Sequence, residues 1–299
     1  MSQKIVPNLW FDRNAEEAGS FYASALPHTT TEVVARYPDE VPDWQAGFAG
    51  EPLVVDVVVD GMRISLINAG PEFRPNPSIS FLLNFDPLAF GGEEGARTAI
   101  DAAWTALSDG GAALMPLDEY PFSPRYGWVQ DRYGVSWQLM LTDPSGEPRP
   151  FVIPQIMFAG DVQDRAREAA EFYTSLFDDA ALGTVVDYAQ QTGTAAAGSV
   201  MFGEFRIGEQ WFAMMDSNVA HDFGFSPGVS LEVRCRDQAE IDRLWDALSA
   251  VPEAEQCGWL ADRFGVSWQI VPDDMAELMA RPGAYERMLQ MKKLVIADF

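Results

Sequence analysis

An internal repeat is the feature that most constrains the fold of this chain. Residues 131–138, Asp-Arg-Tyr-Gly-Val-Ser-Trp-Gln, recur at 262–269 as Asp-Arg-Phe-Gly-Val-Ser-Trp-Gln, with seven of eight positions identical. Weaker matches keep the same order in both halves, pairing 6–11 with 153–158, 17–22 with 169–173, 77–81 with 227–231, and 100–108 with 241–249. A repeat of this kind means that one structural unit occurs twice. We therefore expect two homologous modules.

The segment 142–150 joins the two copies. Its three prolines, with Gly146 and Ser145, are typical of a stiff, exposed linker. We therefore expect the first module to cover residues 1–145 and the second to cover residues 146–299.

The two copies differ most after their second predicted helix. Residues 109–125 separate Ser108 from Tyr126, whereas only residues 250–256 separate Ser249 from Cys257. Long loops that carry aromatic residues are often functional covers. We therefore expect a cover in the first module, and a second module that serves only as a scaffold.

Each copy has the pattern of a strand, a helix and further strands, repeated twice. In the first copy the expected strands are 5–11, 53–59, 62–67, 78–85, 126–130 and 135–141, and the expected helices are 14–25 and 93–107. Asn14 and Glu17 have the spacing of a capping box, and Asp60-Gly61 is a strong hairpin signal. Short helices are expected at 274–280 and 284–293. The pattern predicts an α+β protein.

Composition excludes several classes of protein. The chain has 299 residues, with 20 basic and 45 acidic side chains, and its formal charge is −25. Such a surface repels nucleic acid and anionic lipid. No apolar stretch approaches the roughly 20 residues that span a bilayer, and no signal region is recognisable, which predicts a cytoplasmic protein. Cys235 and Cys257 are too few for a disulfide framework, so we expect both to be free.

Four successive βαβββ units resemble the vicinal oxygen chelate superfamily, which includes glyoxalases and bleomycin-resistance proteins. The motifs at 6–18, 21–22, 76–81, 120–131 and 288–293 are similar to its PhnB-like branch, often labelled 3-demethylubiquinone-9 3-methyltransferase-like. The resemblance implies tandem glyoxalase-like modules with open, cleft-forming mixed sheets. One chain would then imitate the dimer of single-module relatives. No G-x-G follows a predicted strand, so a nucleotide site for S-adenosylmethionine is not expected.

The resemblance also indicates where a metal would bind. Metal-dependent members use His, Gln and Glu side chains on cleft-facing strands. The final-strand Glu falls on Gln138 and Gln269, which lack its charge. The other matched positions are Val6 or Pro7, Ile153 or Pro154, Ser65, Ser78, Ala213 and Gly228. His28 and His221 lie in predicted loops at unmatched positions. We therefore expect neither a metal nor another cofactor.

The remaining candidate site is the cleft itself. Alternation along 135–139 separates Ser136 and Gln138 from the apolar residues, and the resemblance turns the Gln face toward the cleft. Amides would supply hydrogen bonds, tryptophans would form flat walls, and Arg125 would hold any anionic group. The candidate ligand-binding residues are Asn8, Trp10, Arg125, Trp128 and Gln138 in the first module, and Gln155, Met157, Trp259 and Gln269 in the second. Core packing, cross-strand bonding and a plain surface arginine are the structural alternatives.

These observations favour a metal-free protein that binds a small, partly aromatic molecule. The alternative is a metal-dependent lyase, isomerase or dioxygenase-type enzyme. Asp56, Glu204 and Glu232 form no obvious close pair in matched strand positions, so acid–base roles are not expected for them. A third class, a structural interaction module, predicts no enclosed pocket. The sequence leaves open the ligand, any reaction, and association into a homodimer.

Overall fold

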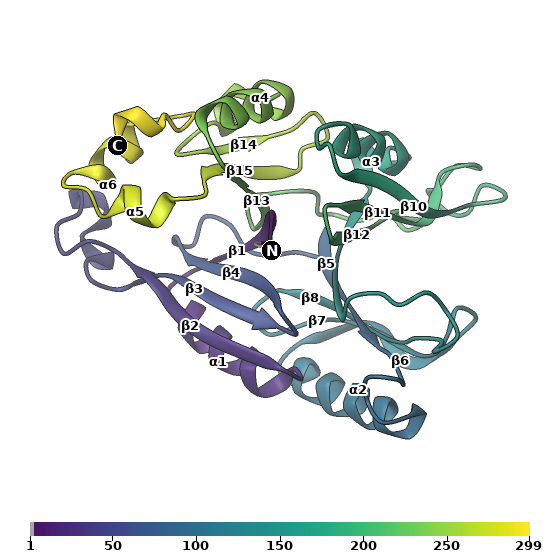
Figure 1. Ribbon diagram of the computed structural model, residues 1–299. Helices are drawn as coiled ribbons and strands as arrows, with labels where there is room; N and C mark the ends of the chain where they lie inside the picture. The colour runs from purple at the N-terminus through teal and green to yellow at the C-terminus, as the bar shows by residue number, and fades with distance from the viewer. Residues whose placement is uncertain (1–2) are drawn as a thin grey trace.

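The computed structural model describes residues 3–299 as two mixed β-sheets, here called sheet A and sheet B (Figure 1). Sheet A has the order β14 (Trp259–Ala261), β15 (Ser267–Pro272), β13 (Val229–Cys235), β1 (Ile5–Phe11), β4 (Met62–Asn68), β3 (Pro52–Val59) and β2 (Thr29–Arg36). Sheet B has the order β10 (Ala180–Asp187), β11 (Val200–Ile207), β12 (Gln210–Asp216), β9 (Val152–Phe158), β5 (Ile79–Phe85), β8 (Ser136–Leu141), β7 (Ser123–Gln130) and β6 (Ala112–Tyr120). The predicted α+β class with mixed sheets is confirmed.

Each sheet joins one unit from each half of the chain. Two βαβββ units form sheet B, whereas sheet A combines a βαβββ unit of the first half with a βαββ unit of the second. In sheet A, β1 pairs with β13 in antiparallel register, and in sheet B, β5 pairs with β9 in the same way. The two sequence halves therefore contribute to both sheets. The nine residues expected to line one cleft in each half are therefore not grouped by half. Sheet A holds Asn8, Trp10, Trp259 and Gln269, and sheet B holds the other five.

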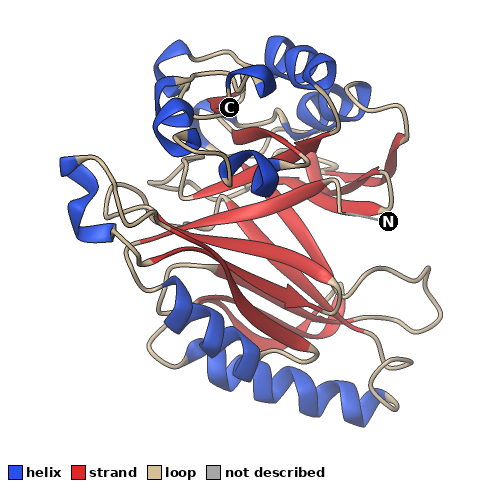
Figure 2. Cartoon of the chain, turned by 60° about the vertical axis from the view of Figure 1, so that its left-hand side comes forward, coloured by secondary structure: helices blue, strands red, loops and turns tan. Residues whose placement is uncertain are grey.

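Four helices cover the outer faces of the sheets: α1 (Ala15–Ala25), α2 (Glu93–Ser108), α3 (Ala166–Ser175) and α4 (Gln238–Leu248). Two shorter helices, α5 (Met275–Met279) and α6 (Ala284–Gln290), lie over the inner face of sheet A. The short 3₁₀ turns are η1 (Asp43–Phe48), η2 (Gly160–Val162), η3 (Pro252–Ala254) and η4 (Ile296–Asp298). Figures 1 and 2 show α1 and α2 on one side of the molecule and α3 and α4 on the opposite side, with the strands between them. Within residues 3–299, no helix has both the length and the apolar character to cross a bilayer.

The repeated motif is explained by a buried carboxylate. Oδ2 of Asp131 accepts hydrogen bonds from the Tyr22 hydroxyl and Trp137 Nε1, both at 2.8 Å. Oδ1 accepts the backbone N–H groups of Tyr133 at 2.8 Å and Val135 at 3.0 Å. Burial raises the pKa of the Asp131 carboxyl, and these hydrogen bonds oppose the rise. One side chain therefore fixes the β7–β8 turn, the following strand and the helix α1.

The second copy repeats this arrangement. Oδ2 of Asp262 accepts hydrogen bonds from the Tyr173 hydroxyl at 2.7 Å and from Trp268 Nε1 at 2.9 Å. Its Oδ1 accepts the backbone N–H groups of Phe264 and Val266 at 2.8 and 3.0 Å. Tyr173 lies on α3, which packs on sheet B, whereas Asp262 precedes β15 of sheet A. The bond therefore links the two sheets, as Tyr22 and Asp131 do in the first copy.

The local predictions have mixed outcomes. Asp60 and Gly61 both have positive φ, 47° and 86°, which suits the predicted hairpin between β3 and β4. The predicted capping box is wrong, because the Asn14 side chain makes no capping bond. The N–H of Ala15 instead donates to Oδ1 of Asn68, at 3.0 Å, at the end of β4. Both cysteines are free, as predicted.

We expect Asp131→Asn and Asp262→Asn each to lower the free energy of unfolding by about 2–4 kcal/mol, since an amide N–H₂ would face buried donors and leave them unpaired. Denaturant titration measures the change. The control is Asp143→Asn on the exposed linker, which should change stability by less than about 0.5 kcal/mol. Equal stability of Asp131→Asn and the wild type would contradict the organising role of this carboxylate.

Candidate functional site

A large cavity lies against the inner face of sheet A, the face opposite α1 and α4. Its volume is about 1420 Å³, above the roughly 300–1,000 Å³ of common ligand pockets. Both halves of the chain line it, the first through Trp10 and Ser65 and the second through Trp259 and Gln269. Figure 1 shows α5 and α6 facing β2–β4 across this region.

A row of polar side chains crosses the floor of this cavity. Strand register aligns, in order, Glu32 on β2, Asp56 on β3, Ser65 on β4, Asn8 on β1, Ser230 on β13 and Ser267 on β15. This set is here called the polar row. Because successive side chains of a strand point to opposite faces, the polar row lies on one face of sheet A and neighbouring core residues such as Leu9 and Leu231 lie on the other. Six strands therefore present polar groups to one line across the sheet.

The hydrogen bonds within the polar row leave some acceptors free. The Ser65 hydroxyl donates to Asp56 Oδ1 at 2.7 Å, and Gln269 Nε2 donates to Ser230 Oγ at 3.0 Å. Oδ1 of Asn8 is buried and has no hydrogen-bond partner within residues 3–299. An unpaired buried acceptor is costly, so it needs an explanation.

Two ion pairs flank the polar row. Arg63 lies 3.4 Å from Asp56, and Arg234 lies 3.0 Å from Glu232. Burial raises the pKa of the Glu232 carboxyl, and the neighbouring Arg234 opposes this rise. One pair comes from each half of the chain.

Aromatic rings form a wall beside the polar row. Trp10 meets Phe73 and Trp259 edge to face, with ring centroids 5.1 and 5.8 Å apart. Trp10 Nε1 donates to the carbonyl of Gly70 at 2.7 Å, which fixes the orientation of the ring. The wall is therefore a rigid apolar surface shared by both sequence halves.

The C-terminal helices form the roof of the cavity. Met275, Met279 and Met288 line it from α5 and α6. The Tyr285 hydroxyl donates to Gln45 Oε1 at 2.8 Å and thereby ties α6 to η1. Methionines adapt to ligands of different shape, so the roof is softer than the aromatic wall.

The corresponding face of sheet B is filled by its own side chains. Trp211 occupies the place of Arg63, and Leu82 that of Glu232, and both belong to a separate apolar cluster with Ile153. Arg149 of the linker pairs with Glu204 at 3.0 Å and stacks 4.1 Å above the Trp211 ring. The linker thus neutralises the carboxylate that corresponds to Asp56.

The long segment of the first copy closes the other end of this face. Residues 112–120 form β6, paired with β7, rather than an open covering loop. The rings of Tyr120 and Phe122 meet that of Tyr126 at 5.5 and 4.9 Å, and the Tyr126 hydroxyl donates to Gln138 Oε1 at 2.6 Å. The aromatic residues therefore fill a space rather than cover an open site.

The shorter second copy leaves sheet A open. Cys257 stands in the place of Tyr126, and no strand corresponding to β6 follows α4 within the described chain. Oε1 of Gln269 therefore receives no hydrogen bond from residues 3–299, unlike that of Gln138. The cavity is lined by residues of both sequence halves and therefore does not follow the expected division into a binding first module and a scaffolding second module.

Three of the nine predicted residues, Trp10, Trp259 and Gln269, line the cavity. Asn8 is 3% exposed and is in register with Ser65, which lines the cavity, but it is not itself a lining residue. Both sequence halves contribute to this group, which the sequence did not predict.

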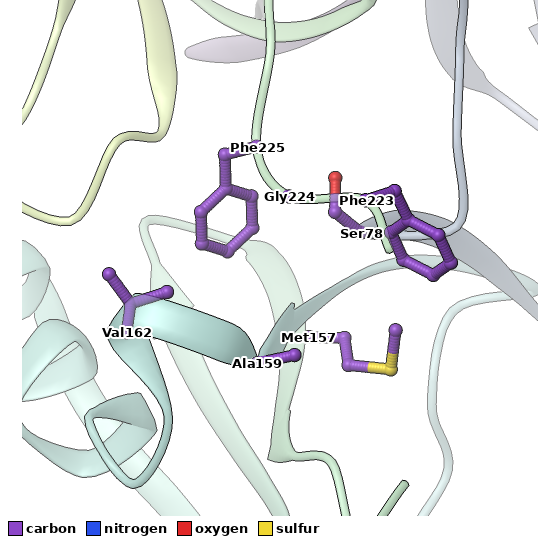
Figure 3. Close-up of a pocket in the computed structure, with 7 residues that line it drawn as sticks. All are labelled: Ser78, Met157, Ala159, Val162, Phe223, Gly224 and Phe225. Carbon is purple, nitrogen blue, oxygen red and sulfur yellow. The ribbon is translucent and has the colours of Figure 1, made fainter. Parts of the chain in front are cut away.

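The other five lie elsewhere. On sheet B, Trp128 Nε1 donates to Ser136 Oγ, Gln155 Nε2 contacts Met215 Sδ, and Gln138 is bonded as described. Met157 lines a small cavity of about 10 Å³, with Ser78 and Phe223 (Figure 3), which is room for about one water molecule. Arg125 lies on the helix side of β7 and forms an ion pair with Asp101 of α2, so it does not reach either inner face.

Sequence reasoning considered Asp56 and Glu232 only for acid–base catalysis and did not place the charged residues in the site. Asp56 interrupts the apolar run Val54 to Val58, and Glu232 and Arg234 alternate with the buried Leu231 and Val233. A charged residue within an otherwise apolar strand is the one sequence signal for this part of the site. It could not be interpreted without knowing that β13 joins the sheet of β1 and β4.

The residues in the floor do not fit the metal centre of metal-dependent relatives. Asn8, Ser65 and Ser230 share one register line, with Gln269 bonded beside them, and all four are neutral. Residues 3–299 contain no group of three or more His, Cys, Asp or Glu side chains placed to hold an ion. Nitrogen donors and a charged oxygen, which such centres use, are missing from this set.

The two sheets of paired units define a glyoxalase-like protein of the vicinal oxygen chelate fold. Glyoxalase I from Zea mays has this fold over 91% of this chain and 92% of its own, with 11% identity and a TM-score of 0.51. The chain belongs to the 3-demethylubiquinone-9 3-methyltransferase family, whose profile matches residues 3–140 and 150–271.

Single-module structures are also similar to this chain. The PhnB protein from Bacillus cereus is 34% identical over 47% of this chain and 100% of its own, with a TM-score of 0.39. A protein from Pseudomonas aeruginosa is 27% identical over 47% of this chain and 98% of its own, with a TM-score of 0.37. The comparison with curated proteins gives no match.

We expect Asn8→Leu to keep or raise the free energy of unfolding, by up to about 1 kcal/mol, because it removes an unpaired buried acceptor. The matched control is Asn84→Leu on β5, whose Nδ2 donates to the Pro150 carbonyl at 2.9 Å. That variant should lose about 1–2 kcal/mol. Denaturant unfolding of both measures the difference, and a larger loss for Asn8→Leu would contradict this assignment.

Proposed function

We propose that this protein binds a small, partly aromatic organic molecule in the cavity of sheet A, without a resident metal ion. The observation that carries the proposal is the difference between the two inner faces. Equivalent positions are plugged by Leu82, Trp211 and Arg149 on sheet B and are open and polar on sheet A. Packing alone does not require an open, polar face, whereas ligand binding does.

Two alternatives are less well supported. A structural interaction module predicts no pocket of ligand size, whereas sheet A carries an open cavity of about 1420 Å³. A metal-dependent lyase, isomerase or dioxygenase needs ligands that the neutral set around Asn8 and Gln269 does not supply. Binding by amides, hydroxyls and aromatic rings matches the side chains present.

Trp259→Leu should weaken the binding of aromatic fragments about fivefold to tenfold, because one ring of the wall is lost. The matched control is Trp128→Leu, the counterpart on β7 of sheet B, which should change fragment affinity less than twofold. Ligand-observed NMR titration of the best hits from an aromatic fragment library measures both. Hits that depend on Trp128 and not on Trp259 would place binding on the wrong sheet and refute the proposal.

Divalent ions should leave the melting temperature unchanged, since a ligand that binds only the folded state would raise it. Thermal-shift measurements with Zn²⁺, Mn²⁺, Fe²⁺, Ni²⁺ and Mg²⁺ test this, and elemental analysis after mild purification should find well under one ion per chain. About one bound ion per chain, together with a clear rise in melting temperature, would establish the metal-dependent alternative instead.

A further inference from the structure

We propose that the ligand carries a phenolic hydroxyl group, which donates to Oε1 of Gln269, and that its ring occupies the place on sheet A where sheet B carries the side chain of Tyr126. This inference rests on the proposed function and specifies the chemical class of the ligand. Its basis is a comparison of the same four side-chain positions in the two sheets.

In sheet B, a phenol ring of the chain itself fills these positions. They form two pairs of facing residues on β7 and β8, Tyr126 with Met140 and Trp128 with Gln138. The Tyr126 hydroxyl reaches diagonally across the group and donates to Gln138 Oε1 at 2.6 Å. Tyr126 is 5% exposed, and burial raises the pKa of its phenol, which therefore stays protonated and donates. Sheet B thus shows how a phenol fits this group.

In sheet A, the repeat places the same tryptophan and glutamine but no ring in the equivalent group. Trp259 faces Gln269 on β14 and β15, and the other two positions are Cys257 and Val271. Both of these side chains are smaller than the Tyr and Met that they replace. All four residues line the cavity. The place that a phenol ring fills in sheet B is therefore open to the cavity in sheet A.

This replacement leaves the amide of Gln269 half paired. Its Nε2 donates to Ser230 Oγ at 3.0 Å, as Nε2 of Gln138 donates to Ser80 Oγ at 2.8 Å. The two amides are therefore held in the same way, with Oε1 left for a second partner. Gln269 is 6% exposed, and its Oε1 accepts no hydrogen bond from residues 3–299. A buried acceptor is costly without a donor, so the complementary ligand group is a donor and not a carboxylate or an ether.

The surroundings of the group suit an aromatic ring. Trp259 meets Trp10 edge to face, with ring centroids 5.8 Å apart. Met288 and Tyr285 of α6 line the cavity beside Cys257, whose thiol donates to the Met288 carbonyl at 3.4 Å. Aromatic edges and thioether sulfur both pack favourably against aromatic rings. A ligand ring therefore finds aromatic neighbours here, as the buried ring of sheet B does in the β6 hairpin.

Three small probes test the proposal. They are p-cresol, which has the structure of a tyrosine side chain, p-methylanisole, in which a methyl group blocks the hydroxyl, and cyclohexanol, an alcohol without an aromatic ring. Protein-observed NMR titration of the whole chain, read at the Trp259 indole N–H, measures their affinities. We expect p-cresol to bind about fivefold to tenfold more tightly than either of the other two, because only p-cresol has both the ring and the donor.

Three variants connect this preference to the group. Gln269→Leu should weaken p-cresol about fivefold and change p-methylanisole less than about twofold, because it removes only the acceptor. Cys257→Tyr and Val271→Met restore the larger side chains of sheet B, and each should weaken p-cresol by filling its place. The matched control is Gln138→Leu, whose acceptor is already paired with the chain's own phenol; it should change p-cresol affinity less than about twofold.

Equal affinities of p-cresol and p-methylanisole, both reported by Trp259, would overturn the inference and leave the proposed function standing. Binding of p-cresol that Gln269→Leu leaves unchanged would have the same consequence. Cyclohexanol binding as tightly as p-cresol would replace the phenol by a general alcohol. Failure of p-cresol to affect Trp259 at millimolar concentration would overturn the inference, and the proposed function would then depend on whether any other aromatic fragment binds through Trp259.

Discussion

The buried carboxylates of Asp131 and Asp262 hold this structure together. Each accepts four hydrogen bonds, two from its own turn, one from a strand tryptophan and one from a helix tyrosine that belongs to the other sheet. A buried charge is tolerated only when its bonding is complete, so the turn, the tryptophan and the tyrosine must all be present together. This requirement accounts for the one segment that the two copies keep nearly unchanged.

Each sheet is built from one unit of each sequence half, and the inner faces of the two sheets differ. Sheet A and sheet B have the same strand order except that sheet A lacks a counterpart of β6, and changes at equivalent positions give their inner faces opposite properties. The inner face of sheet B is filled by Tyr126, by the hairpin of β6 and β7, and by Arg149 of the linker. Cys257 and a short connection leave sheet A open, with α5 and α6 above it. Duplication thus allows one inner face to be filled by stabilising contacts while the other stays open.

Sequence patterns predicted the elements well and the site partly. Alternation around Trp137 and the Asp60-Gly61 turn gave correct strands because these signals are local. The capping box at Asn14 failed because Asn68, distant in sequence, caps α1 instead. Arg125 was misplaced because the alternation that turns Tyr126 and Gln138 to the inner face turns Arg125 toward α2. Glu32, Arg63 and Arg234 carried no recognisable pattern until their strands were assembled.

The sequence by itself determined the duplication, the α+β class, the family and the absence of charge at Gln138 and Gln269, because each depends on residue identity and short-range spacing. Only the tertiary structure decided which units share a sheet, and therefore that Trp10 meets Trp259 and that Asn8 lies between Ser65 and Ser230. Strand pairing over such separations depends on how the two cores pack and on which edges remain free to pair. A local pattern of residues therefore does not predict which distant strands pair.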